Sequence, residues 1–131
     1  MKTIFEKIID REIPADIVYE DDISMAFLTI DPTTKGHILL IPKLPFPRMQ
    51  LVPDELLSDL FIRTKRLMNA MIQGLSCDLV QINVTGEEVP HFHIHLIPRK
   101  HGENLGNISP QTTYQNTEER LLVIDKIKSA L

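Results

Sequence analysis

Hydrophobic positions along the chain recur with two different periods, and the period changes from one segment to the next. Apolar residues spaced three or four apart, the period of an amphipathic helix, occur in residues 3–10, 54–74 and 117–131. Short runs rich in β-branched and other apolar residues indicate five strands, at residues 16–20, 24–30, 37–42, 80–84 and 91–97. The chain is therefore expected to combine five strands with a short first helix, a long central helix and a terminal helix.

Local signals set the expected ends of these elements. Asp54 is the expected N-cap of the long helix, and Gly74 marks its approximate end. Pro42 should end the third strand, and the polar pair Asp21-Asp22 should form the turn between the first two strands. Residues 100–116 are polar and should have little regular structure. One face of the long helix should pack into the core, with Leu57, Leu60, Phe61, Thr64, Met68 and Met71.

Composition describes an ordinary globular chain and excludes several functions. The 131 residues are 43% hydrophobic and 24% charged, which suits a single domain. The net charge of −4 argues against a partner such as nucleic acid, whose long phosphate backbone requires a basic surface. A single cysteine, Cys77, excludes an internal disulfide and a cysteine-rich zinc module.

The absence of three further signals narrows the expectation. No glycine-rich phosphate loop is present, so a nucleotide would have to be bound in another way. The N-terminal residues lack the pattern of a signal peptide, and no apolar run is long enough for a membrane span. A cytoplasmic protein without a membrane partner is therefore expected.

Three of the five histidines lie within five residues of one another, at His91, His93 and His95. Because side chains alternate along a strand, the three rings should share one face, while Phe92 and its apolar neighbours Ile94 and Leu96 point into the core. Strands favour β-branched and aromatic residues, so three histidines on one face are unusual for a purely structural strand. The cluster therefore predicts chemistry.

Two kinds of chemistry suit the cluster. Two neighbouring histidines, whose Cα atoms would be about 6.6 Å apart, could share a metal ion. The Cα atoms of the outer pair would be about 13 Å apart, which is too far for one ion. Zinc would therefore need further ligands, for example His37 or Glu88. Alternatively, a row of imidazoles could attack a phosphorus atom and donate hydrogen bonds to its oxygens. The second interpretation is favoured and requires no metal.

Two sequence blocks resemble the histidine triad (HIT) family of nucleotide hydrolases and transferases. Residues 91–97 match the family's motif His-φ-His-φ-His-φ-φ, in which φ is apolar. Residues 32–43 are similar to its upstream block Pro-x-x-x-Gly-His-x-Leu-φ-φ-Pro-Lys. The opening residues, with Glu12-Ile13-Pro14 and Glu20-Asp21-Asp22, resemble the nucleotide-binding (Hint-like) branch.

The resemblance implies an α+β, HIT-like fold with a five-stranded antiparallel sheet, and a homodimer formed through the long helix and an adjoining strand. Residues 1–99 would form the core, and residues 100–131 a tail of the same domain with a terminal helix. His93 would be the nucleophile on the α-phosphorus, with His91 orienting its ring. His95 and His37 would lie beside the phosphate, and no cofactor would be needed.

The same resemblance implies a pocket for a purine nucleotide or nucleotide conjugate. Its base would lie among apolar side chains, namely Ile4, Phe5, Ile8, Ile13, Phe27, Ile30 and Leu39. The backbone N–H of Val89 and the carboxyl group of Glu88 would lie beside the scissile phosphate, where Glu88 would serve the leaving group. Asn83 is the candidate for a further phosphate contact.

The sequence departs from the family at the ribose site and in one loop. Thr29 stands where relatives carry an aspartate that holds the ribose hydroxyls, and Asp31 lies two positions further on. The stretch 83–88 is about three residues shorter than in relatives, and the Cys-x-x-Cys zinc motif of some relatives is absent.

Three functions remain open from the sequence. The favoured one is hydrolysis of nucleoside phosphoramidates or nucleotidyl conjugates, with an AMP-type product. The alternatives are a dinucleoside polyphosphate hydrolase that uses the same residues and a non-catalytic dimer that binds purine nucleotides.

Overall fold

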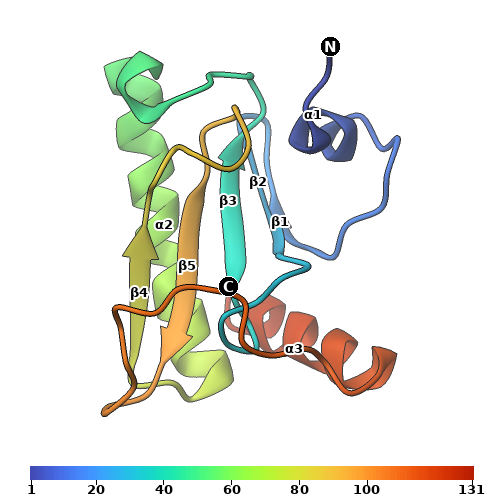
Figure 1. Cartoon of the computed structure of the whole chain (residues 1–131), viewed down its shortest axis with the longest axis vertical. Coiled ribbons are helices and arrows are strands. Elements are labelled where there is room, and N and C mark those ends of the chain that lie inside the picture. The colour runs from blue at the N-terminus through green and yellow to red at the C-terminus, as the bar shows by residue number, and fades with distance from the viewer.

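One antiparallel sheet organises the molecule, as a computed structural model of all residues 1–131 shows (Figure 1). Its strands lie in the order β1-β2-β3-β5-β4. They span Ile17–Glu20 (β1), Ser24–Leu28 (β2), Ile38–Pro42 (β3), Leu79–Asn83 (β4) and Ile94–Arg99 (β5). The five expected strands are confirmed, and their ends lie within three residues of the expected ones.

The helices cover opposite faces of this sheet. They span Ile4–Ile9 (α1), Asp54–Leu75 (α2) and Thr117–Ser129 (α3), with a short 3-10 turn at Met49–Leu51 (η1). Apolar residues of α2 and α3 join one face of the sheet in the larger core, whereas α1 packs on the other face in a smaller one. In Figure 1 the N-terminus lies at the top, above α1, which stands beside the upper end of β1 and β2. Helix α3 lies below the sheet, and the C-terminus lies near the middle of the view, at the lower end of β3. No helix is both long and apolar enough to cross a bilayer.

Helix α1 forms where the sequence predicts a short helix, and a capping box explains how so short a helix begins. The Thr3 hydroxyl accepts a hydrogen bond from the Glu6 backbone N–H, and the Glu6 carboxylate accepts one from the Thr3 N–H. Phe5 and Ile8 are its buried residues. The expected position of their apolar stripe is therefore confirmed.

The ends of α2 differ from the expected ones. Pro53 is the N-cap and Asp54 the first helical residue, so the predicted capping role of Asp54 is wrong. Proline already has a fixed φ and lacks an N–H, and the acidic side chain of Asp54 instead lies in the first turn, where the helix dipole favours it. At the other end, Ser76 rather than Gly74 takes the left-handed conformation, with φ of 55°.

Strand β5 begins at Ile94, later than expected, so His91 and His93 precede the strand and only His95 lies in it. The reason lies in the neighbouring strand. The β3–β5 pairing stops at Leu40 and Ile94, and continuing it would set Phe92 opposite Pro42. Pro42 has no N–H to donate to such a ladder. Its carbonyl oxygen instead contacts the His91 ring at Nε2, 2.7 Å away.

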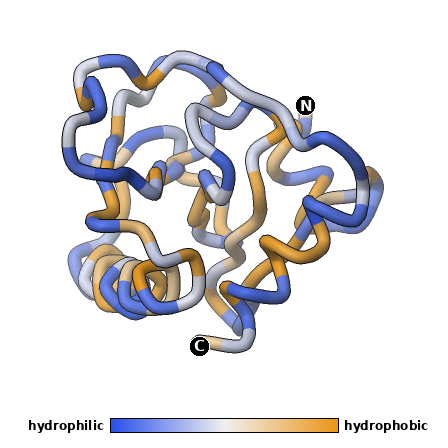
Figure 2. The backbone as a smooth tube through the Cα atoms, turned by 90° about the horizontal axis from the view of Figure 1, so that it is seen from below, coloured by the Kyte–Doolittle hydropathy of each residue, from blue (hydrophilic) through white to orange (hydrophobic).

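The expected inward side chains of the histidine segment are confirmed. Phe92, Ile94 and Leu96 belong to the larger core between the sheet and α2. The opposite face of this segment is not exposed either, since all residues from His91 to Arg99 are buried. Hydrophilic residues predominate in the outer loops of the molecule, as Figure 2 shows.

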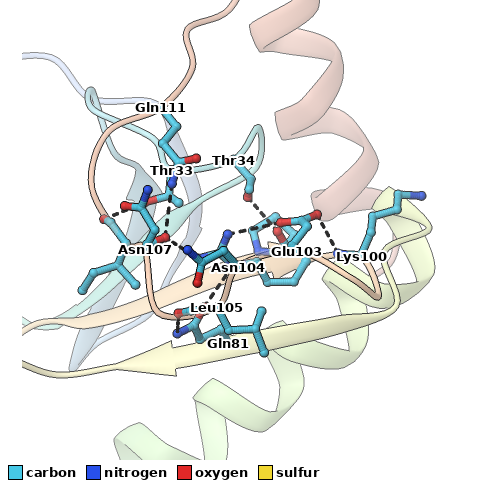
Figure 3. A network of polar contacts seen from close by, with 12 residues as sticks. Thr33, Thr34, Gln81, Lys100, Glu103, Asn104, Leu105, Asn107 and Gln111 are labelled. Carbon is cyan, nitrogen blue, oxygen red and sulfur yellow. Dashed lines mark hydrogen bonds and ion pairs between the residues drawn. The ribbon is translucent and has the colours of Figure 1, made fainter.

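Residues 100–116 contain no helix or strand, as expected, yet polar contacts fix them to the sheet (Figure 3). The buried guanidinium of Arg99 bonds Gln81, Glu103 and the Asn107 carbonyl oxygen. The Thr33 hydroxyl donates to the Ile108 carbonyl oxygen at 2.8 Å. The loop is thereby tied to the turn that precedes β3.

Gly74 packs where α2 crosses α3, and this contact yields a stability prediction. A Cβ at this position would lie 2.2 Å from the Lys126 carbonyl oxygen, a backbone atom that cannot move aside cheaply. We expect Gly74→Ala to lower the free energy of unfolding by about 2 kcal/mol, despite the better helix propensity of alanine. Urea denaturation measures the change.

Gly106→Ala is the matched control, because its Cβ would meet only the flexible Asn104 side chain at 3.4 Å. We expect its stability to stay within about 0.5 kcal/mol of the parent. Equal stability of the two variants would contradict the proposed role of Gly74.

Candidate functional site

A pocket of about 510 Å³ opens between α1 and the sheet, on the face opposite α2. Most of its wall is apolar, and a few polar groups stand at its rim. This combination suits a small organic ligand with a charged end. The lining comprises Ile4, Phe5, Ile8, Ile13, Pro14, Ala15, Asp16, Phe27, Leu28, Thr29, Ile30, Asp31, Leu39, Glu88, Val89 and Arg120.

Every residue expected around the base lines this pocket, although not all of them are core residues. Phe5, Ile8, Phe27 and Leu39 are buried and form its floor. Ile4 and Ile30 lie at the rim and are 47% and 86% exposed. Exposed apolar side chains beside a pocket are available to a ligand, which a purely structural core residue is not.

The central histidine lies between α1 and the strands. The Phe5 ring meets the His93 ring edge-on, with ring centroids 5.1 Å apart, and also contacts the His91 ring at 5.9 Å. His95 lies on the other side of His93, again at 5.1 Å between centroids. All three histidines are buried, so the ring of His93 has little freedom to rotate.

Backbone carbonyl groups fix which nitrogens of His91 and His93 carry protons. His93 Nδ1 lies 2.8 Å from the His91 carbonyl oxygen, and His91 Nε2 lies 2.7 Å from the Pro42 carbonyl oxygen. A carbonyl oxygen can only accept, so each of these nitrogens must donate. In neutral His93 the lone pair is therefore on Nε2, which is the nitrogen free to act as a nucleophile.

A second chain of hydrogen bonds fixes the proton of His95. The Thr33 backbone N–H donates to His37 Nδ1 at 3.0 Å, so neutral His37 carries its proton on Nε2. That nitrogen lies 2.9 Å from His95 Nδ1 and donates to it. Neutral His95 then has its proton on Nε2, a buried atom with no hydrogen-bond partner in the protein. The site thus sets a lone pair on His93 beside a donor on His95.

Burial favours the neutral form of the His37, His91 and His95 rings by lowering the pKa of each. Desolvation, together with the nearby His95 and Arg99, lowers the pKa of His37 to about 3. The pKa values of His91 and His95 are also lowered, in both cases mainly by burial. The tautomers derived for neutral rings are therefore those that apply at physiological pH.

Glu88 stands over the two reactive rings from the loop that follows β4. Its carboxylate oxygens lie 3.9 Å from His93 Nε2 and 3.6 Å from His95 Nε2, and its side chain is 57% exposed. Both distances are too long for a hydrogen bond between Glu88 and either ring. The ligand atoms of Glu88, His93 and His95 lie within 4.8 Å of one another, so the same three groups could hold a metal ion.

Asn83 lies outside the pocket but next to the histidines. It pairs with His95 across the β4–β5 ladder, so the two side chains share one face of the sheet. Its Nδ2 is buried and has no hydrogen-bond partner. A donor left free beside His95 suits an anionic group, and the phosphate contact of Asn83 stays a prediction.

Two polar pocket residues were not expected from the sequence. Asp16 and Arg120 line the rim and form an ion pair, with 3.0 Å between Arg120 Nε and Asp16 Oδ2. Arg120 comes from α3, about ninety positions beyond the rim residues 29–31, and no local motif marks it. His101, expected at the surface, is exposed.

Comparisons with known proteins agree with this geometry. The family model described as "HIT domain" matches residues 10–102. An uncharacterized HIT-like protein of Methanocaldococcus jannaschii is 42% identical over 105 residues, which cover 76% of this chain and 81% of the relative. Adenosine 5′-monophosphoramidase of Saccharomyces cerevisiae is 42% identical over 99 residues, which cover 74% of this chain and 62% of the relative.

A solved structure supports the same assignment. A HIT-like protein from Bartonella henselae, described as involved in cell-cycle regulation, superposes with a TM-score of 0.87 at 30% identity, covering 99% of this chain and 96% of the other. Together these matches define a histidine triad fold and motif. The chain belongs to the HIT family.

Because these histidines are buried, we expect the free energy of unfolding to depend on pH. A histidine with a lowered pKa binds its proton in the unfolded chain but not in the folded one, so its stabilising effect is complete above about pH 6.5 and declines as pH falls towards 3. For His37 the loss at pH 5 should be about 2 kcal/mol.

We expect His37→Gln to flatten the decline in unfolding free energy between pH 7.5 and pH 5, as measured by urea denaturation at each pH. Replacing the exposed His101 with glutamine is the control, and it should leave the slope unchanged. A His37 variant with the parent's slope would contradict the neutral, buried state of this ring.

Proposed function

We propose that this protein is a nucleotide hydrolase that acts on the α-phosphate of nucleoside phosphoramidates or nucleotidyl conjugates. The observation that carries the proposal is the free lone pair of His93 Nε2, held beside the Nε2–H donor of His95 and next to a largely apolar pocket. The similarity to a yeast adenosine 5′-monophosphoramidase supports the choice of substrate class.

The first step is transfer of the nucleotidyl group to the protein. His93 Nε2 attacks the α-phosphorus and forms a P–N bond, while the bond from phosphorus to the leaving amine breaks. The leaving amine takes a proton as it departs, and Glu88, at 3.9 Å from His93 Nε2, is the group we assign to the leaving side. The Nε2–H of His95 and the amide of Asn83 donate hydrogen bonds to the phosphoryl oxygens.

The second step is hydrolysis of the nucleotidyl-histidine. A water molecule attacks phosphorus and gives a proton to the Glu88 carboxylate, which replaces the proton taken by the amine. The P–N bond to His93 breaks, and the nucleoside monophosphate leaves. His93 regains its neutral form with the proton on Nδ1, because the Nδ1–H group stays hydrogen-bonded to the His91 carbonyl oxygen throughout. His91 thus acts as a positioning residue through its backbone, while its ring is anchored on Pro42.

The rest of the nucleotide would occupy the pocket. The purine would lie between the α1 side chains Phe5 and Ile8 and the sheet residues Phe27 and Leu39. Flat apolar surfaces on both sides favour an aromatic base. The backbone N–H of Val89, at the rim beside Glu88, would contact the phosphate.

We further propose a homodimer formed through α2 and β4. Strand β4 is the last in the sheet order, so its outer edge has no partner strand within the chain. α2 also exposes Ile62 and Ile72, at 50% and 40%. Residues 1–99 and the tail 100–131 would act as one domain, with α3 packed on α2 and β1.

The central prediction concerns His93. We expect the protein to release AMP from an adenosine 5′-phosphoramidate, and His93→Ala to reduce kcat/KM by about 10⁴-fold or more, because the nucleophile is lost. His101→Ala should retain full activity. Activity should persist in the presence of a chelator, and mass spectrometry of quenched reactions should map the nucleotidyl adduct to His93.

Each alternative gives a different result in the same assay. Loss of turnover with chelator would favour a metal bound by Glu88, His93 and His95 and would contradict the proposal. Faster turnover of a diadenosine polyphosphate would point to a dinucleoside polyphosphate hydrolase. Binding of AMP without turnover of either substrate would identify a non-catalytic binder.

The role of Glu88 is tested with leaving groups of different basicity. We expect Glu88→Gln to lower kcat for an alkylamine phosphoramidate by about 10² and to have little effect on a mixed anhydride, whose leaving group needs no proton. Glu87→Gln, one residue earlier, is the matched control. An equal loss on both substrates would contradict the assignment.

A further inference from the structure

The rim of the pocket carries a polar group of residues that the proposed chemistry does not use. Asp16, Thr29 and Arg120 all belong to it, and Asp16 and Arg120 form an ion pair. These three and Ile30 also line a second, adjoining pocket of about 410 Å³. They therefore stand where the two pockets meet and where a bound ligand would be in reach.

Asp16 is held in place from two sides. Its carbonyl oxygen accepts a hydrogen bond from the Leu28 N–H at 3.0 Å, which extends the β1–β2 pairing and brings Asp16 beside Thr29. Its carboxylate oxygen Oδ2 lies 3.0 Å from Arg120 Nε. The other oxygen, Oδ1, accepts no hydrogen bond in the protein, so it remains available to a ligand.

Arg120 also retains an unused donor. Its Nε is enclosed beside Asp16, whereas its two terminal nitrogens make no hydrogen bond in the protein, and the side chain is 39% exposed. The pair therefore offers both a free acceptor and a free donor at the same point. A hydroxyl group needs one of each, because it donates through its hydrogen and accepts through its oxygen.

The position of this pair relative to the histidines identifies the part of the ligand it would meet. The Thr29 N–H donates to the His37 carbonyl oxygen at 3.1 Å, so Thr29 neighbours the ring that bonds His95. A nucleotide with its phosphate at His93 and its base over Phe27 has its sugar between these points. Its hydroxyl groups then face the rim at Thr29.

We propose that Asp16, positioned by Arg120, binds the 2′,3′-diol of the nucleotide's ribose. The inference rests on the proposed nucleotide site and names the residues that select a ribonucleotide. The pocket lining carries three carboxylates, on Asp16, Asp31 and Glu88, against one cation, Arg120. This negative balance favours neutral, hydrogen-donating hydroxyl groups over a second phosphate at the rim.

The neighbouring polar residues are less suited to the diol. Thr29 has a single hydroxyl group, and its oxygen accepts a hydrogen bond from the Asp31 N–H at 3.3 Å. Asp31 itself is exposed in the turn before Pro32, and no side-chain contact orients its carboxylate. Asp16 alone among the rim carboxylates combines a fixed position with a free oxygen.

Paired substrates test the inference. An adenosine 5′-phosphoramidate is compared with its 2′-deoxy and 3′-deoxy counterparts, and we expect kcat/KM of the parent protein to favour the ribose form by about ten-fold to a hundred-fold. Asp16→Asn should bring this ratio close to one, mainly by slowing the ribose substrate. Arg120→Gln should reduce the ratio, and Arg120→Lys should partly restore it.

Two further variants separate binding from structure. Asp125→Asn, a carboxylate change on an exposed turn of α3, is the matched control and should leave the ratio unchanged. Thr29→Asp should restore the ribose preference to the Asp16→Asn protein, since it returns a carboxylate to the same rim, but should add little to the parent. Thermal unfolding verifies that each variant is folded.

The results that would overturn the inference are specific. Equal losses on ribose and deoxyribose substrates in Asp16→Asn would mean that the ion pair only fastens α3 to β1. A collapse of the ratio in Asp31→Asn instead would assign the diol to Asp31. If no phosphoramidate is hydrolysed, the proposed function fails, but calorimetric binding of AMP against 2′-deoxy-AMP still tests Asp16 through the same ratio.

Discussion

The pairing of β3 with β5 is the contact on which the rest of the molecule depends. It joins residues 38–40 to residues 94–96, more than fifty positions apart in the chain, and both strands are buried throughout. Core packing against α2 occupies one face of this pair, and the histidines occupy the other. The early end of the pairing, at Ile94, is equally important. Because Pro42 cannot extend the ladder, His91 and His93 leave the strand, and their rings are held by carbonyl groups instead of by strand geometry.

In this site, the two nitrogens of His93 have separate roles, one structural and one free for chemistry. The His93 ring is held in place by the hydrogen bond of Nδ1, and its other nitrogen, Nε2, makes no structural hydrogen bond and keeps its lone pair. Burial excludes the charged form of the surrounding rings, so the donor–acceptor order does not change near neutral pH. The small helix α1 completes the arrangement, since Phe5 contacts both His91 and His93.

Much of the fold could be predicted from the sequence because its signals are local. The spacing of apolar residues marks α1, α2 and α3, and β-branched runs mark the five strands. The His-φ-His-φ-His block identifies the family for the same reason. Errors arise where a distant residue decides the outcome, as at the start of β5, which depends on Pro42. The Asp16–Arg120 pair is missed for the same physical reason, since the ion pair joins residues whose separation along the chain carries no periodicity.

Besides the His37 side chain, which donates to His95, the groups that set the proton positions are atoms of the main chain: the carbonyl oxygens of His91 and Pro42 and the N–H of Thr33. A point mutation replaces a side chain but leaves these atoms in place. Proton positions set by these main-chain atoms therefore persist when the residues that supply the atoms are substituted, as long as the backbone keeps its path. The rim, in contrast, is built from side chains such as Thr29, Asp16 and Arg120, each of which one codon can alter. In a chain of this design, the range of accepted substrates can diverge over evolutionary time while the reaction itself stays constant.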